Sequence, residues 1–358
     1  MKIKLFYCQY RCNPPRTGGE WAYHHTINYL SSQPYINLKE LDDNDVSAIK
    51  TGSISLKTQF RFFKKFWRLP AATIIVQASE SCLQLCLANW ALKLRRHRPH
   101  ILILVHSDPF LKGMNWKGVL VDGTCFKTFV RSADRLVANS LDMCQRLLRL
   151  GVNREKITVI TPPPQVLPRS KVAPQNNGTI QIICPSNIYA KKGQEVLIEA
   201  MQHIEDSRVT AILPGLVKDP KYRQRLGSLV KQYGLNRRIT FAGYLNGQEM
   251  ANAYAQSDIC VVPSLHEPFG MVVQEAMLFG LPVIASRVGG LTEQIKDGVN
   301  GLLVPPGDSD ALAEAIQRLS SDSDLRMTLL KNAKEKTKTF PTWESVMERT
   351  CNVVREMA

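Results

Sequence analysis

Two carboxylates eight positions apart are the first candidates for chemistry in this sequence. Glu267 lies early in the stretch HEPFGMVVQEAM, residues 266–277, and Glu275 lies near its end. On a helix, residues three and four positions apart share a face. The helical neighbours of Glu275 are all apolar: Met271, Val272, Leu278 and Phe279. Because an unpaired buried charge is costly, a polar group must meet this carboxylate.

The pattern around the two glutamates predicts the elements that position them. Residues 258–264 (DICVVPS) predict a strand, LHEPFG a loop, and the residues from about Gly270 a helix. In open α/β sheets, ligands bind beyond the carboxyl ends of strands, beside helix N-termini. Gly270 allows a close approach of the backbone, and the first helical N–H groups favour an anion such as a diphosphate.

Glu267 and Glu275 can then point into one cleft. An ionised carboxylate only accepts hydrogen bonds, which suits the binding of sugar hydroxyls. The alternative is that Glu267 is an ordinary loop acid and that Glu275 is buried against partners within the protein. The spacing alone leaves both interpretations open.

Length and composition are typical of a two-domain globular protein. A chain of 358 residues is longer than a single domain with one hydrophobic core usually is. Hydrophobic residues make up 44% of it and charged residues 22%, as in soluble globular proteins. No apolar run has the length of a membrane span, and that of the N-terminal MKIKLFYCQYRC is too short for a signal peptide. Nine cysteines without a C-x-x-C pair fit neither a disulfide framework nor a zinc site. We therefore expect a cytoplasmic protein.

The net charge of +15 is confined to the N-terminal half. Residues 1–175 contain 26 Lys and Arg against 11 Asp and Glu, whereas residues 176–358 contain 20 of each. This asymmetry indicates an anionic partner for the first half: a membrane surface, an acidic acceptor or nucleic acid. No nucleic-acid-binding motif appears, so nucleic acid is not an expected partner.

Two basic segments favour the membrane surface. In FRFFKKFWRLP, residues 60–70, a helix places the aromatic residues on one side and the basic residues on the other, as in interfacial helices. Residues 93–98 add a second basic cluster, and each basic residue near anionic lipid contributes about 1 kcal/mol. We expect peripheral attachment at the inner face of the membrane. The alternative is a helix that packs its aromatics on the domain and presents its charges to an acidic soluble acceptor.

Short apolar runs alternate with helix-like stretches, which predicts a parallel α/β architecture. The expected strands are residues 3–7, 73–78, 101–105, 135–139, 179–184, 209–215, 239–244, 258–264, 282–286 and 301–305. We predict two doubly wound domains, residues 1–165 and 178–338, joined by a Pro-rich linker at 166–177. Residues 339–358 predict a terminal helix.

Further candidates lie at strand ends and turns. Lys192 precedes a predicted helix, Gly18 and Gly19 follow the first strand, and His106 ends the strand 101–105. Taken alone, each also fits a structural role, as a surface lysine, a plain turn and a strand-end histidine. The acidic triplet at 43–45 has the D-x-D spacing of a metal motif, but it follows no apolar strand, so we assign no metal.

The run SLHEPFGMVVQEAMLFGLPVIASRVGGLTEQIKDGVNGLLVPPGD, residues 264–308, resembles the signature of the family 4 retaining glycosyltransferases of GT-B fold. That signature is E-P-F-G with a second Glu eight residues after the first, then G-x-P-V, a Gly-Gly turn and G-L-L-V-P-P-G-D. The resemblance extends to residues 13–21, 137–152, 191–200 and 239–245. It implies two Rossmann-like doubly wound domains facing a central cleft, with the C-terminal helix crossing back to the N-terminal domain.

The resemblance also implies roles for the candidate residues. Glu275 would receive the ribose hydroxyls of a nucleotide-sugar donor, and Glu267 would face the donor sugar near the reacting carbon. Lys192 would pair with the diphosphate and offset the charge that develops as the glycosidic bond breaks. Backbone amides would hold the sugar and the diphosphate at Phe269, Gly270, Met271 and Val272.

The N-terminal domain would contribute Gly18 and Gly19 against the diphosphate, and His106 against the donor sugar or the acceptor. The catalytic residues would thus be Glu267, His106 and Lys192. One position departs from the family, because Asn187 stands where an arginine usually grips the diphosphate. Asn187 can hydrogen-bond a phosphate but brings no charge.

The predicted activity is retaining, metal-independent transfer of a hexose from a UDP- or GDP-sugar to an acceptor hydroxyl, with no cofactor. The expected acceptor is a glycan or lipid-linked carrier of polysaccharide or lipopolysaccharide biosynthesis. A small soluble acceptor is one alternative. The other is a non-catalytic nucleotide-sugar-binding protein of the same fold, which the substitution at Asn187 favours.

Overall fold

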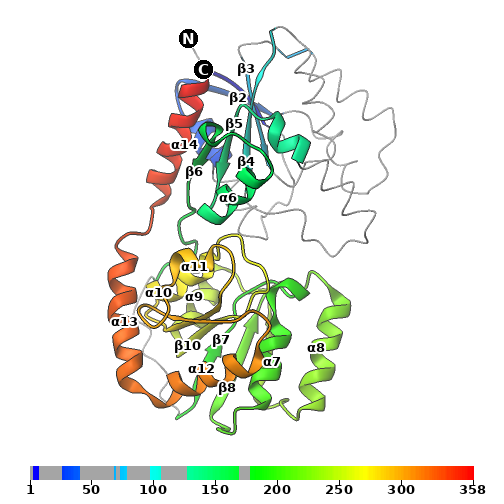
Figure 1. The fold of residues 1–358 in the computed structure, drawn as a ribbon, viewed down its shortest axis with the longest axis vertical. Coiled ribbons are helices and arrows are strands. Elements are labelled where there is room, and N and C mark those ends of the chain that lie inside the picture. The colour runs from blue at the N-terminus through cyan, green and yellow to red at the C-terminus, as the bar shows by residue number, and fades with distance from the viewer. Residues whose placement is uncertain are drawn as a thin grey trace. The chain divides into compact units, whose positions relative to one another are not determined.

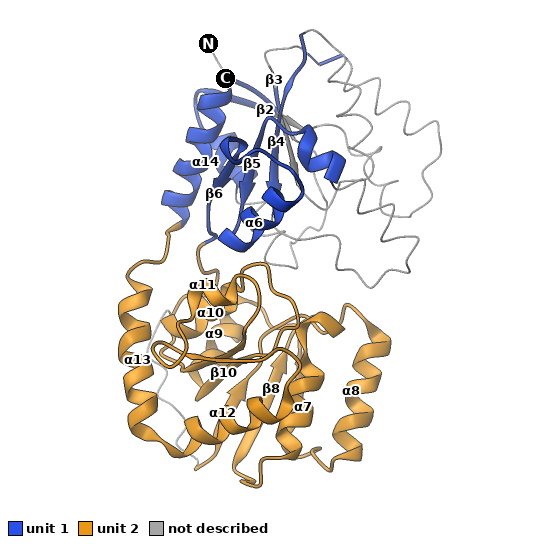
Figure 2. Cartoon of the chain, in the orientation of Figure 1, with its two compact units in different colours: residues 1–162, 343–358 blue, residues 163–342 orange. Residues whose placement is uncertain are grey.

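The computed structural model describes most of the chain in two compact units. The described residues are 3–7, 26–40, 68–69, 73–78, 97–105, 127–168 and 178–358. Unit 1 comprises residues 1–162 and 343–358, and unit 2 comprises residues 163–342 (Figure 2). Outside the described ranges lie Gly18, Gly19, His106, the acidic triplet at 43–45, and most of the basic segments at 60–70 and 93–98.

Unit 1 is built on a six-stranded parallel sheet with the order β2-β1-β3-β4-β5-β6 (Figure 1). Its strands are β1 (Ile3–Tyr7), β2 (Ile36–Glu40), β3 (Thr73–Ala78), β4 (His100–Val105), β5 (Arg135–Ala138) and β6 (Ile157–Val159). In β4 every residue after His100 is buried, as expected for a strand covered on both faces. The helix α6 (Leu141–Arg149) follows β5, and its N-terminus is capped by Ser140, whose hydroxyl accepts the N–H of Met143.

The C-terminal helix α14 (Trp343–Met357) belongs to unit 1. Its apolar face, which includes Val346, Met347 and Val354, shares one core cluster with Leu5 of β1 and Leu102 of β4. On the polar face, the guanidinium of Arg349 donates to the carbonyl of Val159 at 2.7 Å. The predicted return of this helix to the N-terminal domain is confirmed. Among the described residues, no helix combines the length and the apolar character needed to cross a membrane.

Unit 2 is a second six-stranded parallel sheet, with the order β12-β11-β10-β7-β8-β9. Its strands are β7 (Ile180–Ile183), β8 (Val209–Pro214), β9 (Ile239–Gly243), β10 (Ile259–Val262), β11 (Val283–Ser286) and β12 (Leu302–Val304). Its helices are α7 (Gln194–Gln202), α8 (Pro220–Gln232), α9 (Gly247–Ala255), α10 (Met271–Leu278), α11 (Leu291–Gln294), α12 (Ser309–Ser321) and α13 (Ser323–Thr337).

The strand order of unit 2 reverses between β7 and β10. From β7 the chain moves outward through β8 and β9, and it then returns to the other side of β7 with β10, β11 and β12. Ligands of open α/β sheets bind at such a switch point, beyond the carboxyl ends of the two strands. The loops that follow β7 and β10 carry Lys192 and Glu267, respectively.

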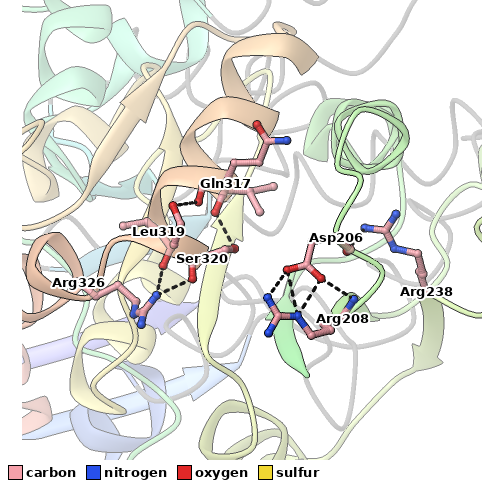
Figure 3. Close-up of polar contacts among 9 residues, drawn as sticks. Asp206, Arg208, Arg238, Gln317, Leu319, Ser320 and Arg326 are labelled. Carbon is pink, nitrogen blue, oxygen red and sulfur yellow. Dashed lines mark hydrogen bonds and ion pairs between the residues drawn. The ribbon is translucent and has the colours of Figure 1, made fainter. Parts of the chain in front are cut away.

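Two arginine side chains of unit 2 donate hydrogen bonds to backbone carbonyls near the start of β8 and at the end of α12. Arg238 donates to four of them, those of Met201, Ile204, Asp206 and Val209, at 2.8–3.3 Å. Figure 3 shows Arg238 beside Asp206, whose carboxylate forms a solvent-exposed ion pair with Arg208. The same figure shows Arg326 at the end of α12. There, Arg326 donates to the carbonyls of Leu319 and Ser320, which lack partners within the helix.

Arg238→Met tests how much the hydrogen bonds from Arg238 to these carbonyls contribute to stability. The substitution keeps the apolar stem but leaves four carbonyls without their guanidinium donor. We expect the free energy of unfolding to fall by about 2–3 kcal/mol, as measured by chemical denaturation.

Arg208→Met is the matched control, because it breaks only the solvent-exposed pair with Asp206. We expect no measurable change for this variant. Equal stability of the two variants would contradict the assignment.

Candidate functional site

An ion pair between Lys192 and Glu267 lies at the switch point of unit 2. Lys192 ends a short 3₁₀ helix, Ala190–Lys192, in the loop after β7, and Glu267 lies in the loop after β10. The Nζ of Lys192 is 2.5 Å from Oε2 of Glu267, and the hydroxyl of Ser264 donates to the same oxygen at 3.2 Å. The two charged side chains are 18% and 9% exposed. The structure therefore brings together two residues that the sequence predicts to be catalytic.

The two loops meet because Gly193 has no side chain. Its φ of 66° is in the left-handed region, and a Cβ added there would lie 1.9 Å from the carbonyl oxygen of Pro263. The contact is continued by the N–H of Leu265, which donates to the carbonyl of Lys191 at 2.8 Å. Any larger residue at 193 would push the loops apart and separate the ion pair.

The charge of Lys192 is stabilised in place. Burial by itself lowers the pKa of this ammonium group, but the negative charge of Glu267 and the neighbouring Tyr189 outweigh burial, so the pKa is raised above 10.5. Lys192 therefore remains a cation throughout the neutral pH range. The site holds one fixed positive charge beside one carboxylate.

The start of α10 offers backbone donors next to this pair. Gly270 precedes the helix with φ 86° in the left-handed region. Among the described residues, no acceptor meets the N–H groups of Gly270, Met271 and Val272. These groups and the helix dipole together favour an anion. Phe269 is buried, and its carbonyl accepts the Nε2 of Gln294.

Glu275 is buried in unit 2 and satisfied by protein groups. Its Oε2 accepts the hydroxyl of Tyr254 at 2.8 Å, and its Oε1 accepts the N–H groups of Gln165 and Val166 at 3.2 and 3.3 Å. Burial raises the pKa of Glu275 and outweighs these donors, which lower it. The polar partner that the sequence analysis required is thus found within the chain. A carboxylate offers about four acceptor positions, of which donors among the described residues occupy three.

Asn187 supports the backbone on the other side of Lys192. Its Oδ1 accepts the N–H of Leu216 at 3.2 Å, and its carbonyl accepts the Nε2 of Gln194 at 2.9 Å. The adjacent turn is tight, because a Cβ on Gly215 would lie 1.9 Å from the carbonyl oxygen of Ser186. The amide that replaces the usual arginine is therefore engaged in holding the turn after β8.

A cavity of about 670 Å³ opens on unit 2, and Gln294 is part of its lining. It is lined by residues of the segment 287–303 and by Asn332 and Lys336 of α13. None of the residues predicted from the sequence lines it. The chemistry at the switch point, with its paired charges and the N–H groups at the start of α10, makes the loops after β7 and β10 the stronger candidate site.

Three side chains of the site were missed by the sequence analysis: Tyr254, Ser264 and Gln294. Tyr254 fits the apolar pattern of α9 like any core aromatic, and Ser264 ends a predicted strand. Gln294 follows the Gly-Gly turn at 289–290, and only its burial and its contacts distinguish it. No local pattern marks a residue whose partner lies 20 or more positions away, as for Tyr254 and Glu275.

Two families match successive parts of the sequence. Glycosyltransferase Family 4 matches residues 53–163, and Glycosyl transferases group 1 matches residues 169–336. An uncharacterised glycosyltransferase of Methanocaldococcus jannaschii is 30% identical over 261 residues, which cover 73% of this chain and 69% of that protein. The chain belongs to the group 1, family 4 type glycosyltransferases.

Other members of this glycosyltransferase family match over shorter regions. A second M. jannaschii glycosyltransferase is 37% identical over 166 residues, 46% of this chain and 42% of that protein. D-inositol 3-phosphate glycosyltransferase of Xylanimonas cellulosilytica is 29% identical over 226 residues, 59% of this chain and 54% of that protein. The chain therefore spans about half the length of these two relatives. The lipopolysaccharide core biosynthesis glycosyltransferase of Rhizobium meliloti is 29% identical over 251 residues, which cover 67% of this chain and 71% of that protein.

Solved glycosyltransferase structures share the fold. Sucrose-phosphate synthase from Thermosynechococcus elongatus has a TM-score of 0.78 at 24% identity, with 99% of each chain covered. The Anabaena protein HepE, crystallised with UDP and glucose, has a TM-score of 0.77 at 21% identity, with 99% of this chain and 100% of that chain covered. The GT-B fold predicted from the sequence is confirmed.

Removing both charges of the Lys192–Glu267 pair should cost less stability than the sum of removing each one alone. Lys192→Met leaves a buried carboxylate unpaired, and Glu267→Met leaves a buried ammonium, so each should destabilise unit 2 by roughly 3–5 kcal/mol. The double variant carries neither charge. We expect its loss to be smaller than the sum of the single losses, as measured by denaturation of all four proteins.

Arg225 and Glu195 form the control pair on the surface of the same unit. The corresponding cycle of Arg225→Met and Glu195→Met should show additive, small effects because solvent screens the pair. Additive losses at Lys192 and Glu267 as well would show that the two charges do not interact.

Glu275→Gln should change how stability depends on pH. The pKa of Glu275 is raised above 4.5 in the folded protein, so the folded state holds this proton more tightly than the unfolded chain does. The stability that this group contributes is present below pH 4.5 and is lost as the pH rises through the raised pKa. Glutamine does not titrate. We expect the Tm of the variant, relative to wild type, to increase from pH 4.5 towards neutral pH without nucleotide. A constant or falling difference would refute this.

Proposed function

We propose that the chain transfers a sugar from a UDP- or GDP-sugar to an acceptor hydroxyl, with retention of anomeric configuration and without a metal ion. The observation that carries the proposal is the Lys192–Glu267 pair at the switch point, adjacent to N–H groups at the start of α10 that meet no acceptor in the described part of the chain. A diphosphate needs positive charge and N–H donors, and a reacting sugar needs a nearby carboxylate. Both sets of groups lie on neighbouring loops of unit 2.

Lys192 would act on the leaving group. An ammonium has three donors, so Lys192 can keep one hydrogen bond to Glu267 and offer the others to the diphosphate. As the glycosidic bond breaks, negative charge grows on the diphosphate, and the fixed cation stabilises it. The raised pKa of Lys192 keeps that cation present in the neutral range.

Glu267 would act on the sugar. Its Oε2 is held by Lys192 and Ser264, which fixes the position of the carboxylate. A carboxylate held in this way stabilises the positive charge that develops on the anomeric carbon. In this mechanism the leaving diphosphate takes the acceptor proton, so no side chain has to be a strong base.

Glu275 would take one ribose hydroxyl at the acceptor position that Tyr254, Gln165 and Val166 leave open. HepE is crystallised with UDP-glucose and with UDP, which supports a nucleotide-sugar donor for this chain. In the absence of an arginine at 187, Lys192 and the N–H groups of α10 would carry the diphosphate.

For the acceptor we propose a glycan or a lipid-linked carrier. The match to a lipopolysaccharide core glycosyltransferase and the basic N-terminal half support this choice. One member of the basic segment 93–98 is already engaged, because Arg98 forms a bidentate pair with Asp134 at 2.6 and 2.7 Å. Contact with anionic lipid, at the cytoplasmic face of a membrane, would therefore depend on the other basic residues of the two segments.

Asn187 favours a second candidate, a nucleotide-sugar-binding protein without transferase activity. Its side chain brings no charge to the diphosphate, and its Oδ1 accepts the N–H of Leu216, which ties the amide to the turn after β8. The two candidates agree on the ligand and differ in turnover.

A donor screen separates the two functions. UDP-, GDP- and ADP-sugars are tested first for a rise in Tm, which reports binding to the folded state, and then for sugar transfer to glycan acceptors, with the anomer of the product assigned by NMR. We expect one nucleotide class to stabilise the protein and to support transfer. Lys192→Met should lower turnover by roughly 10²–10³-fold.

Arg225→Met is the control for the screen, because Arg225 lies on the surface between α7 and α8. It should leave turnover unchanged. Binding without sugar release or transfer would favour the non-catalytic protein, and the absence of binding by any nucleotide sugar would remove both candidates.

A further inference from the structure

Gln294, the last residue of α11, contacts the loop that carries Glu267. The side chain is 5% exposed. Its Nε2 donates to the carbonyl of Phe269 in a short hydrogen bond and to the carbonyl of Gly270 at 3.2 Å. Two carbonyls on one side fix the orientation of the amide, because the reverse orientation would place its oxygen against both of them.

The other end of this amide is unsatisfied. The Oε1 of Gln294 is buried and finds no partner among the described residues. A buried acceptor without a partner is unfavourable, and an apolar side chain of the same length would avoid this. The donor end of Gln294 is therefore the part that the site uses.

The two carbonyls determine where the neighbouring N–H groups point. In a trans peptide, the C=O and the N–H of one unit point in opposite directions. Drawing the carbonyls of Phe269 and Gly270 towards Gln294 turns the N–H groups of Gly270 and Met271 away from it. With Gly270 left-handed and Met271 helical, successive N–H groups converge on one side, as in the backbone nests that bind anions.

Gln294 is itself held firmly. The Nδ2 of Asn300 donates to the carbonyl of Gln294 at 2.9 Å, and the Oδ1 of Asn300 accepts the N–H of Lys296 at 2.7 Å. Gly290 packs behind the same loop, since a Cβ there would lie 2.5 Å from the Cα of Phe269. The N–H of Gly290 also donates to the carbonyl of Glu267 at 3.0 Å. The support behind the loop is therefore rigid.

We infer that Gln294 is a positioning residue, which aims the N–H groups of Gly270 and Met271 at the diphosphate of the donor. The inference rests on the proposed function. Gln294 does not touch the ligand. It acts through the backbone, and it affects the diphosphate and not the nucleoside, whose ribose is assigned to Glu275.

The test compares two ligands on one variant. Gln294→Met keeps an unbranched side chain of similar length and removes the donor. Dissociation constants are measured by calorimetry for the nucleoside diphosphate that binds wild type and for its nucleoside alone. We expect the diphosphate to bind about tenfold more weakly or worse, and the nucleoside to change less than about twofold, within the scatter of additive effects. The same two dissociation constants are measured for Gln294→Leu, so that the test does not depend on the folding of Gln294→Met alone.

Gln274→Met is the matched control. Gln274 lies on α10, is also buried, and also has an Oε1 without a partner among the described residues. For Gln274→Met, we expect the same ratio between the affinities for the nucleoside diphosphate and the nucleoside as in wild type. Equal losses for nucleoside and diphosphate at Gln294, or no loss for the diphosphate, would overturn the inference. If wild type binds no nucleoside diphosphate at all, the proposed function fails instead.

Discussion

The close approach of two loops at Gly193 is the constraint on which the site depends. Only a residue without a Cβ lets the backbone after β7 come against the carbonyl of Pro263, the first residue after β10. That contact sets the separation of Lys192 and Glu267, whose charged atoms would otherwise each face the cost of burial alone. The reversal of strand order between β7 and β10 makes the two loops neighbours, and the missing side chain makes them touch.

The carboxylates of Glu267 and Glu275 are both buried, but they have different kinds of hydrogen-bond partner. Glu267 is paired with the ammonium group of Lys192, whose pKa is raised by this carboxylate. Glu275 meets only neutral donors, so its environment favours the protonated form more than water does. The same residue type at two positions thus has two electrostatic characters. One carboxylate suits a reaction in which charge develops, and the other suits the recognition of hydroxyls.

The sequence predicts the inner strands better than the edges. All ten expected strands are present within a few residues, because each contains a short apolar run, and they include β9 and β12, the edges of the unit 2 sheet. The two that were missed, β2 (INLKE) and β6 (ITV), are the edges of the unit 1 sheet, where polar residues and short length hide the signal. Likewise, Glu267 is marked by the motif and Lys192 by the family resemblance around residues 191–200. Gln294 is marked by neither, because its role depends on a contact with Phe269, 25 positions earlier.

The place of α14 in unit 1 has a consequence for synthesis of the protein. Residues 163–342 form a contiguous unit, whereas the core of unit 1 includes side chains of residues 343–357. During translation the later unit has all of its sequence before the earlier one does. Until residues 343–357 have been made, the side chains of Leu5, Ile74 and Leu102 lack the members of their core cluster that α14 supplies. The order in which the units complete their cores is the reverse of their order in the gene.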